Sequence, residues 1–405
     1  MTFKYRLKPT KAQRTQLEQT LELCRSVYNS TLAVRKNTYE RDGKSLSYYD
    51  TKKLLPQWKI NFTDLKQVHS QVLQNVVMRV DLAYQAFFRR VKVGEGPGYP
   101  RFKGKGQYKS LTYPQYGNGV SLNNDILTLS KIGDVKVVMH RPVKGDTKTV
   151  TVQRSAGKWY ACFSCEVEPE PLPPSPEVVG VDLGLKYFAT LSNGESIKRQ
   201  RWMKRDTQDI ARLQRKKEQY PTGCCERRKV VKALNHAYQR SNNRRNDFAH
   251  QESRKLVNRY GLIVFEDLNI QDMQSNGYRV INRNIADVAW ARFVQYTAYK
   301  AENAGRSVIQ INPRGTTQAC SDCGMIVPKD LSVRVHECPH CGLKIDRDLN
   351  AALNILALGL QSIGADSSHR DASQSVTRRS PSLEAWEWSH CNTVMESTFN
   401  HQTLC

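Results

Sequence analysis

The sequence lacks any long hydrophobic segment. No apolar run reaches the ~18 residues that a membrane-spanning helix needs, and the N-terminal stretch MTFKYRLKPT contains no apolar signal core. We therefore expect a cytoplasmic protein that is not secreted and has no membrane partner.

A disulfide framework is also missing, although the chain contains 11 cysteines. Four of them, in two Cys-x-x-Cys pairs, have the spacing of a metal site, and the other seven form no disulfide framework, so we expect a reducing compartment. Cys162 and Cys165 share the same spacing, but they lie within an apolar strand pattern. We interpret them as strand residues, with metal binding as the alternative.

Negative charge is scarce relative to positive charge. The 405 residues include 62 Lys and Arg against 38 Asp and Glu, which gives a formal net charge of +24. This excess indicates a polyanionic partner, and nucleic acid is favoured over a membrane surface. The length allows two or three domains, each with its own core.

The two Cys-x-x-Cys pairs have the spacing of a zinc ribbon. Cys320 and Cys323 are separated from Cys338 and Cys341 by 14 residues, and a glycine follows each pair. Four thiolates favour tetrahedral zinc with no open coordination position. We therefore expect a structural site and look for chemistry elsewhere.

The N-terminal part combines a helical unit with short strands. Residues 3–8 alternate apolar and basic side chains, and Thr10 with Gln13 predicts a capping box for a helix that ends near Asp42 and Gly43. Further helices are expected at 47–60 and 64–92, and several strands at 118–168. These strands predict a small β-barrel or sandwich, which the first strand joins.

Between the helices and strands lies a basic, glycine-rich segment with interleaved aromatics. The candidates for contact with nucleic acid are Tyr99, Arg101, Phe102, Lys103 and Lys105. Such residues can bind phosphates and stack on bases. A solvated loop with a few tucked aromatics fits the composition equally well.

A proline-rich linker at 169–176 marks a domain boundary. After it we expect a buried strand that ends at Asp182, a hairpin turn at Asn193 and Gly194, and a charged helical hairpin at 203–259. A second buried strand ends at Glu266, and a helix at about 286–303 and a strand at 307–313 precede the cysteines. Residues 361–405 are polar and aperiodic, which indicates a largely disordered tail.

Three acids occupy positions that call for an explanation. Asp182 and Glu266 end core strands, and Asp348 lies at the start of a late helix. Converging carboxylates remain ionised only if cations share the site, and oxygen ligands favour Mg²⁺ or Mn²⁺. Two such ions support phosphodiester hydrolysis. The alternatives are a hydrogen bond that Asp182 accepts from a turn amide, a solvated strand end at Glu266 and a simple helix cap at Asp348.

Several stretches resemble one family. VGVDLGLKYFATLSNGE, HQESRKLVNRYGLIVFEDLNI, CSDCG and CPHCGLKIDRDLNAALNIL are similar to the transposon-encoded TnpB (OrfB) proteins, relatives of type V CRISPR effectors. KYRLKPTKAQ, GYPRFKGKG and NIADVAWARFVQYTAYKAENAG extend the resemblance over nearly the whole chain. It implies a multidomain α+β protein with an RNase H-like (RuvC) nuclease domain, an inserted zinc ribbon and a preceding wedge β-barrel that carries a helical recognition domain.

The resemblance implies the following domain ranges. The wedge barrel would comprise residues 1–9 and 99–170, with the recognition domain at 10–98. The nuclease domain would comprise 171–316, including the hairpin 203–259, and 344–362. The zinc ribbon would occupy 317–343 and bind target nucleic acid, and the tail would be 363–405.

The resemblance also implies roles for individual residues. The catalytic, magnesium-binding acids would be Asp182, Glu266 and Asp348, with Asp267 and Asp346 as the competing assignments. The zinc ligands would be Cys320, Cys323, Cys338 and Cys341. Apart from the resemblance, Lys186 is close to Asp182 in the sequence and Arg314 precedes the first cysteine, so both are candidates for contact with the scissile strand. Surface or structural roles fit them as well.

The implied activity is RNA-guided cleavage of DNA by an enzyme of an insertion sequence. A guide RNA from the transposon end would pair with double-stranded target DNA beside a short flanking motif. The ribonucleoprotein would contain one copy of the chain and associate with the nucleoid of a prokaryotic cell. Two alternatives are a non-cutting RNA-guided or zinc-ribbon regulator and a transposase that performs strand transfer.

Overall fold

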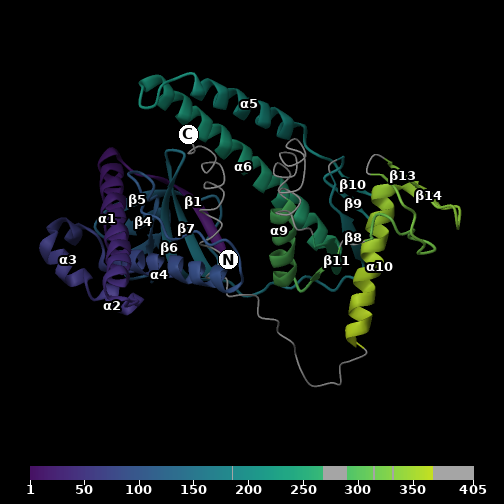
Figure 1. The fold of residues 1–405 in the computed structure, drawn as a ribbon, viewed down its shortest axis with the longest axis horizontal. Coiled ribbons are helices and arrows are strands. Elements are labelled where there is room, and N and C mark those ends of the chain that lie inside the picture. Colours follow the sequence, from purple (N-terminus) through teal and green to yellow (C-terminus); the bar gives the residue numbers. More distant parts are fainter. Residues whose placement is uncertain (185, 268–289, 313–314, 331–332, 368–405) are drawn as a thin grey trace. The chain divides into compact units, whose positions relative to one another are not determined.

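The computed structural model describes residues 1–184, 186–267, 290–312, 315–330 and 333–367 (Figure 1). The chain divides into two units. The first combines residues 1–175 and 199–261 with described residues between 290 and 307, and the second contains the other described residues. One division between them, at Ser175 and Pro176, falls in the proline-rich linker.

In the first unit, strand β1 (Thr2–Lys8) lies inside a seven-stranded antiparallel sheet. It pairs with β5 (Gly133–Val138) and β7 (Lys158–Glu166), which confirms that the first strand joins the later ones. Phe3, Tyr5 and Leu7 are buried and alternate with exposed residues, so one face of β1 lies against the core. The strand order is β2-β6-β7-β1-β5-β4-β3, with β2 (Ser110–Tyr113), β3 (Val120–Asn123), β4 (Ile126–Leu129) and β6 (Asp146–Ser155).

Two-residue turns connect neighbouring strands of this sheet. Ala156 (φ 46°) and Gly157 (φ 75°) join β6 to β7, and both have the positive φ that tight hairpin turns require. Asn124 (φ 53°) begins the turn between β3 and β4. Cys162 and Cys165 are strand residues of β7, as predicted.

Helix α1 (Lys11–Asp42) begins and ends at the predicted residues. Thr10 and Gln13 form the capping box, and Gly43 ends the helix at φ 63°. The helix predicted from residue 64 is divided in two. Residues Thr63–Gln67 form a 3-10 helix, and the extended backbone of Val68 separates this helix from α4 (Ser70–Lys92). Two short helices precede them: α2 (Tyr48–Lys52) and α3 (Leu55–Asn61).

The described residues of the first unit also include a helical hairpin and helix α9 (Trp290–Asn303). The predicted helical hairpin consists of α5 (Arg201–Glu218) and α6 (Cys225–Arg259). Helix α9 packs against α6, where the buried Lys300 ammonium donates to the His250 carbonyl at 2.6 Å and to the Ser253 hydroxyl at 2.7 Å. The beginning of the predicted 286–303 helix lies outside the described residues.

The second unit contains a five-stranded mixed sheet. Its order is β10-β9-β8-β11-β12, with β8 (Val178–Asp182), β9 (Ala189–Leu191), β10 (Ser196–Ile197), β11 (Leu262–Glu266) and β12 (Ser307–Ile311). β8 and β11 run parallel at its centre, and Val179, Val181 and Val264 are fully buried. The hairpin predicted at Asn193 and Gly194 joins β9 to β10.

Helix α10 (Arg347–Ser367) packs against β8. A Cβ atom on Gly180 would lie 2.2 Å from the Ala352 carbonyl oxygen, so only glycine permits this close approach of strand and helix. The helix continues beyond residue 362, the expected end of the last nuclease segment. The predicted tail lies outside the described residues from residue 368 on. A short hairpin of β13 (Val335–Glu337) and β14 (Lys344–Asp346) precedes α10.

Among the described residues, no helix combines the length and apolar character needed to cross a membrane.

Candidate active site and cysteine cluster

Asp182 and Glu266 lie side by side at one edge of the second unit's sheet. Each is the last residue of its strand, and the parallel register aligns Phe265 with Val181, immediately before the two acids. Asp182 is half-buried and Glu266 is only 9% exposed. Glu266 is therefore not the solvated strand end that the sequence allowed.

Helix α10 brings a third acid to this edge. Asp348, its second residue, is only 5% exposed. Asp182 interacts electrostatically with Glu266, Asp348 and Asp346. The structure thus brings together the three acids that the sequence singles out, from two strands and one helix.

Burial and mutual repulsion disfavour the ionised form of these acids. Burial, followed by the charges of Glu266 and Asp348, raises the pKa of Asp182 to about 8. Burial also raises the pKa of Glu266, and a hydrogen bond from Thr316 opposes that change. A divalent cation would offset this repulsion and favour the carboxylates.

Asp346 and Asp267, the two competing acids, have different surroundings. One oxygen of Asp346 accepts the backbone N–H groups of Asp348 at 2.9 Å and Leu349 at 3.3 Å, so Asp346 caps α10. Asp267 follows β11 and is exposed. The cap that the sequence allowed for Asp348 is therefore provided by Asp346.

Cationic side chains among the described residues lie near the acids. Arg347 donates to the Asp348 carboxylate from Nη2 at 3.1 Å, and Arg334 approaches the same oxygen at 3.9 Å. The ammonium nitrogen of Lys186 lies 3.8 Å from Oδ2 of Asp346. Arg347 also lowers the pKa of Asp182, although burial and the neighbouring acids outweigh it.

The acids present the oxygen donors that Mg²⁺ and Mn²⁺ prefer. Their surroundings fit a cation because burial and repulsion leave Asp182 undercompensated. Within the described residues, the four cysteines are the single group of His, Cys, Asp or Glu side chains whose ligand atoms all lie within 4.8 Å of one another.

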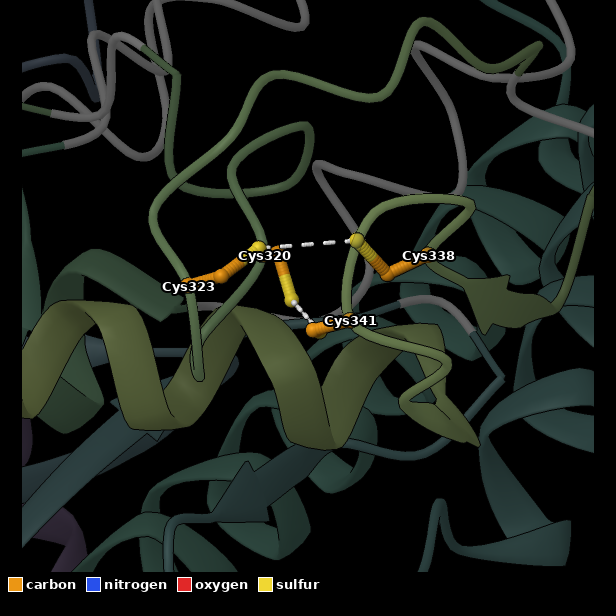
Figure 2. A group of neighbouring side chains, drawn as sticks. All are labelled: Cys320, Cys323, Cys338 and Cys341. Carbon is orange, nitrogen blue, oxygen red and sulfur yellow. Dashed lines mark hydrogen bonds between the residues drawn. The ribbon is translucent and has the colours of Figure 1, made fainter.

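The cysteines lie on two loops with matching backbone geometry (Figure 2). The Cys320 carbonyl accepts the Gly324 N–H at 2.9 Å, and the Cys338 carbonyl accepts the Gly342 N–H at 2.9 Å. The two glycines have φ values of 75° and 78°, a left-handed conformation that closes each loop tightly around its pair of thiols. Each pair thus forms a compact knuckle.

The four thiols fit a tetrahedral metal. Sγ of Cys320 lies 3.6 Å from that of Cys341, and Cys323 and Cys338 have the same separation (Figure 2). Zn–S bonds of ~2.3 Å at tetrahedral angles would place sulfur atoms ~3.8 Å apart. The backbone N–H groups of Cys341 and His340 help lower the pKa of Cys338, whereas burial and the other three thiols raise the pKa of Cys341. A bound cation would favour the thiolate form of all four.

The expected nucleic-acid contacts lie on a loop of the first unit. Tyr99 and Phe102 are 45% and 52% exposed, and Arg101 and Lys105 are also exposed. The backbone of Lys103 is bound by Asn29 and Arg25 of α1, so the loop has a defined position. Lys186 is exposed, and Arg314 lies outside the described residues.

Residues that orient these sites were not anticipated from the sequence. Thr316 binds the Glu266 carboxylate, and two asparagines of α10, Asn350 and Asn354, bind the segment that leads to the first cysteine pair. The only available signal was the four-residue spacing of these asparagines, which places them on one helix face.

Three family models match parts of the chain. A helix-turn-helix domain model matches residues 1–44, a probable transposase model of the OrfB type matches 162–277, and a Cas12f1-like TNB domain model matches 290–355. The last match contains the four cysteines and Asp348.

Two curated relatives cover most of the chain. A candidate RNA-guided DNA endonuclease of Streptomyces pristinaespiralis is 33% identical over 88% of this chain and 89% of its own length. InsQ of Escherichia coli (strain K12), also named as a candidate RNA-guided DNA endonuclease, is 31% identical over 88% of this chain and 92% of its length.

A solved structure has a similar fold. The mini-RNA-guided endonuclease CRISPR-Cas_phi3 aligns over 89% of this chain and 92% of its own, with a TM-score of 0.50 and 10% identity. The curated relatives, together with the OrfB model, establish the family on sequence. The chain belongs to the TnpB (OrfB) family, as its motifs predicted.

Proposed function

We propose that this protein is an RNA-guided DNA endonuclease of an insertion sequence. The observation that carries the proposal is the convergence of Asp182, Glu266 and Asp348, which are buried or half-buried and come from distant parts of the sequence. Relatives that cover nearly the whole chain bear the name of this activity. The net charge of +24 suits RNA and DNA partners.

The reaction is hydrolysis of a phosphodiester bond in target DNA. Two Mg²⁺ ions, when bound, supply activation of the attacking water and stabilisation of the leaving oxygen. Asp182, Glu266 and Asp348 hold these ions through their carboxylates, and the strand ends and helix start fix the three side chains. Mn²⁺ can occupy the same oxygen ligands.

The two large sheets have separate roles in this proposal. The mixed sheet with α10 forms an RNase H-like (RuvC) nuclease domain, and the seven-stranded sheet forms the wedge that carries the recognition helices. Zinc on the four cysteines is structural, because four thiolates leave no position for substrate. The proposal includes one copy of the chain per ribonucleoprotein and association with the nucleoid of a prokaryotic cell.

The loop at 99–105 contributes to holding nucleic acid. Its exposed aromatics, Tyr99 and Phe102, offer faces on which unpaired bases stack, and Arg101, Lys103 and Lys105 supply charge for phosphates. Lys186, beside the acids, is a candidate contact of the strand to be cut, and Arg314 is a second.

The proposal is tested with the protein purified together with its co-expressed RNA. That RNA is sequenced, and DNA that matches its guide is supplied with randomised flanking positions and Mg²⁺. We expect one defined RNA and cleavage only of matching DNA beside a particular flanking sequence. DNA bound without cleavage would indicate a regulator, and strand-joined products would indicate a transposase.

A further inference from the structure

A buried threonine binds one of the proposed catalytic acids. The Thr316 hydroxyl donates to Oε1 of Glu266 at 2.5 Å, and Thr316 is only 2% exposed. A glutamate side chain has three rotatable bonds, so its strand position alone does not fix its carboxylate. A hydroxyl has one proton to donate, and this one is directed at a single oxygen of Glu266. The other oxygen, Oε2, is not engaged by this bond.

The backbone of Thr316 is itself bound to helix α10. Asn354 Nδ2 donates to the carbonyls of Thr316 and Ala319, each at 2.8 Å. One turn earlier, Asn350 Nδ2 donates to the Ala319 carbonyl at 2.7 Å, and its Oδ1 accepts the Ser321 N–H at 2.9 Å. These bonds join the segment 316–321 to the helix that also carries Asp348.

The same segment contains a metal ligand of the cysteine cluster. Cys320 lies between Ala319 and Ser321, the two residues that Asn350 holds. A short stretch of backbone therefore connects the first knuckle to Thr316, whose hydroxyl holds Glu266. Contiguous hydrogen-bonded contacts of this kind can carry energetic coupling between two sites, which measured coupling must establish.

We infer that Thr316 is a positioning residue for Glu266, and that segment 316–321 couples the cysteine cluster to this acid. The inference rests on the proposed function, because it takes Glu266 as a ligand of the catalytic ions. Thr316 orients the carboxylate, and Asn354 holds Thr316 in place. Loss of a group that orients a metal ligand typically costs about 10- to 100-fold in metal affinity or activity.

The test compares Thr316→Val, which has the same shape without a hydroxyl, with Thr316→Ser, which retains one. The exposed neighbour variant Thr317→Val is the matched control. Two quantities are measured: Mn²⁺ affinity of the full-length protein by titration calorimetry, and the Mg²⁺ concentration that gives half-maximal cleavage by the ribonucleoprotein. Zinc content is measured for every variant.

We expect Thr316→Val to weaken Mn²⁺ binding and to raise the half-maximal Mg²⁺ concentration, each by about 10-fold or more. Thr316→Ser and Thr317→Val should remain within about threefold of the wild type, and all variants should retain zinc. Equal values for Thr316→Val and Thr317→Val would overturn the inference. A loss in Thr316→Ser as large as that in Thr316→Val would also overturn it, since the hydroxyl would then not be the operative group.

The coupling is tested with Asn354→Asp, which removes the amide donor while retaining the side-chain shape. If Asn354 acts through Thr316, the double variant Thr316→Val/Asn354→Asp will lose no more Mn²⁺ affinity than the worse single variant. If the fold-losses of Mn²⁺ affinity in the two single variants multiply in the double variant, the coupling is contradicted. Chelation of zinc should lower the Mn²⁺ affinity of the wild type by as much as Thr316→Val does. In Thr316→Val, chelation should lower the Mn²⁺ affinity by less.

These outcomes separate the inference from the proposed function. If the wild-type ribonucleoprotein makes no Mg²⁺-dependent cut, the proposed function fails. The Mn²⁺ titration still reports whether Thr316 contributes to cation binding by these acids. If the wild type cuts and Thr316→Val is indistinguishable from it in both measurements, only the inference fails.

Discussion

The carboxylate of Asp346 accepts the backbone N–H of Asp348 at 2.9 Å. This bond makes Asp346 the N-cap of α10 and leaves the Asp348 side chain facing the acids of the sheet. Two aspartates that differ by two positions thus have distinct surroundings, and the difference predicts distinct effects of substitution.

Asparagine caps a helix as well as aspartate does. We therefore expect Asp346→Asn to keep most of the DNA-cleavage rate and Asp346→Ala to lower the free energy of unfolding by about 1 kcal/mol. Asp348→Asn should reduce the cleavage rate more than about 100-fold, because losing a metal ligand costs more than losing a group that orients one. Initial cleavage rates and denaturant unfolding measure both effects. Equal rate losses at the two positions would refute the division of roles.

The repulsion around Asp182 predicts a pH-dependent stability of the metal-free protein. Its pKa is about 8 in the folded chain and ~3.9 when unfolded. Stability from the protonated form is therefore complete below ~4 and is lost as the pH rises through about 8.

Asp182→Asn removes this pH dependence. We expect the variant to unfold at a higher temperature than the wild type at pH 8, by about 2 °C or more, with a smaller difference at pH 5.5. Addition of Mg²⁺ should stabilise the wild type and reduce the difference. Thermal unfolding followed by circular dichroism in EDTA and in Mg²⁺ checks this. A stabilisation by Asp182→Asn that is larger at pH 5.5 than at pH 8 would have the wrong sign.

The cysteine cluster predicts a zinc requirement for folding of its module. We expect about one zinc ion per chain in the wild type, loss of that zinc in Cys320→Ser, and a lower unfolding temperature. Cys225→Ser is the control, because Cys225 is exposed in α6 and lies outside the cluster. Mass spectrometry of bound metal provides the measurement. Full zinc content in Cys320→Ser would exclude the four-thiolate site.

Two glycines of α10 predict opposite effects of the same substitution. A Cβ on Gly359 would lie 2.5 Å from the buried side chain of Val264, whereas a Cβ on Gly364 would meet nothing within 4 Å. Gly359→Ala should therefore lower the free energy of unfolding by about 1–3 kcal/mol through overpacking. Gly364→Ala should raise it by about 0.5–1 kcal/mol, since alanine favours the helix. Denaturant titrations decide between these signs, and stabilisation by Gly359→Ala would contradict the packing of α10 on β11.

Much of this arrangement could be predicted from the sequence. The apolar runs that end in Asp182 and Glu266 indicate buried strands with a carboxylate at the end, and the cysteine spacing indicates the two knuckles. The choice between Asp346 and Asp348 could not be made by pattern, because a helix cap and a metal ligand both favour an acid near a helix start. The role of Thr316 could not be predicted from local sequence, because it depends on a contact with Glu266, 50 residues earlier. The break at Val68 in the helix expected from residue 64 could not be predicted. Val68 has an extended backbone, but its apolar side chain fits the helical periodicity of the sequence.

The central claim is that Asp182 belongs to a carboxylate site that cuts guide-matched DNA with Mg²⁺. The most direct test compares cleavage by ribonucleoproteins containing the wild type, Asp182→Asn and Asp267→Asn, the last as an exposed acid close to Glu266 in the sequence. Guide RNA and target DNA binding are measured alongside. We predict that Asp182→Asn loses more than about 100-fold in cleavage rate with binding intact, and that Asp267→Asn cuts like the wild type. Undiminished cleavage by Asp182→Asn would contradict the claim.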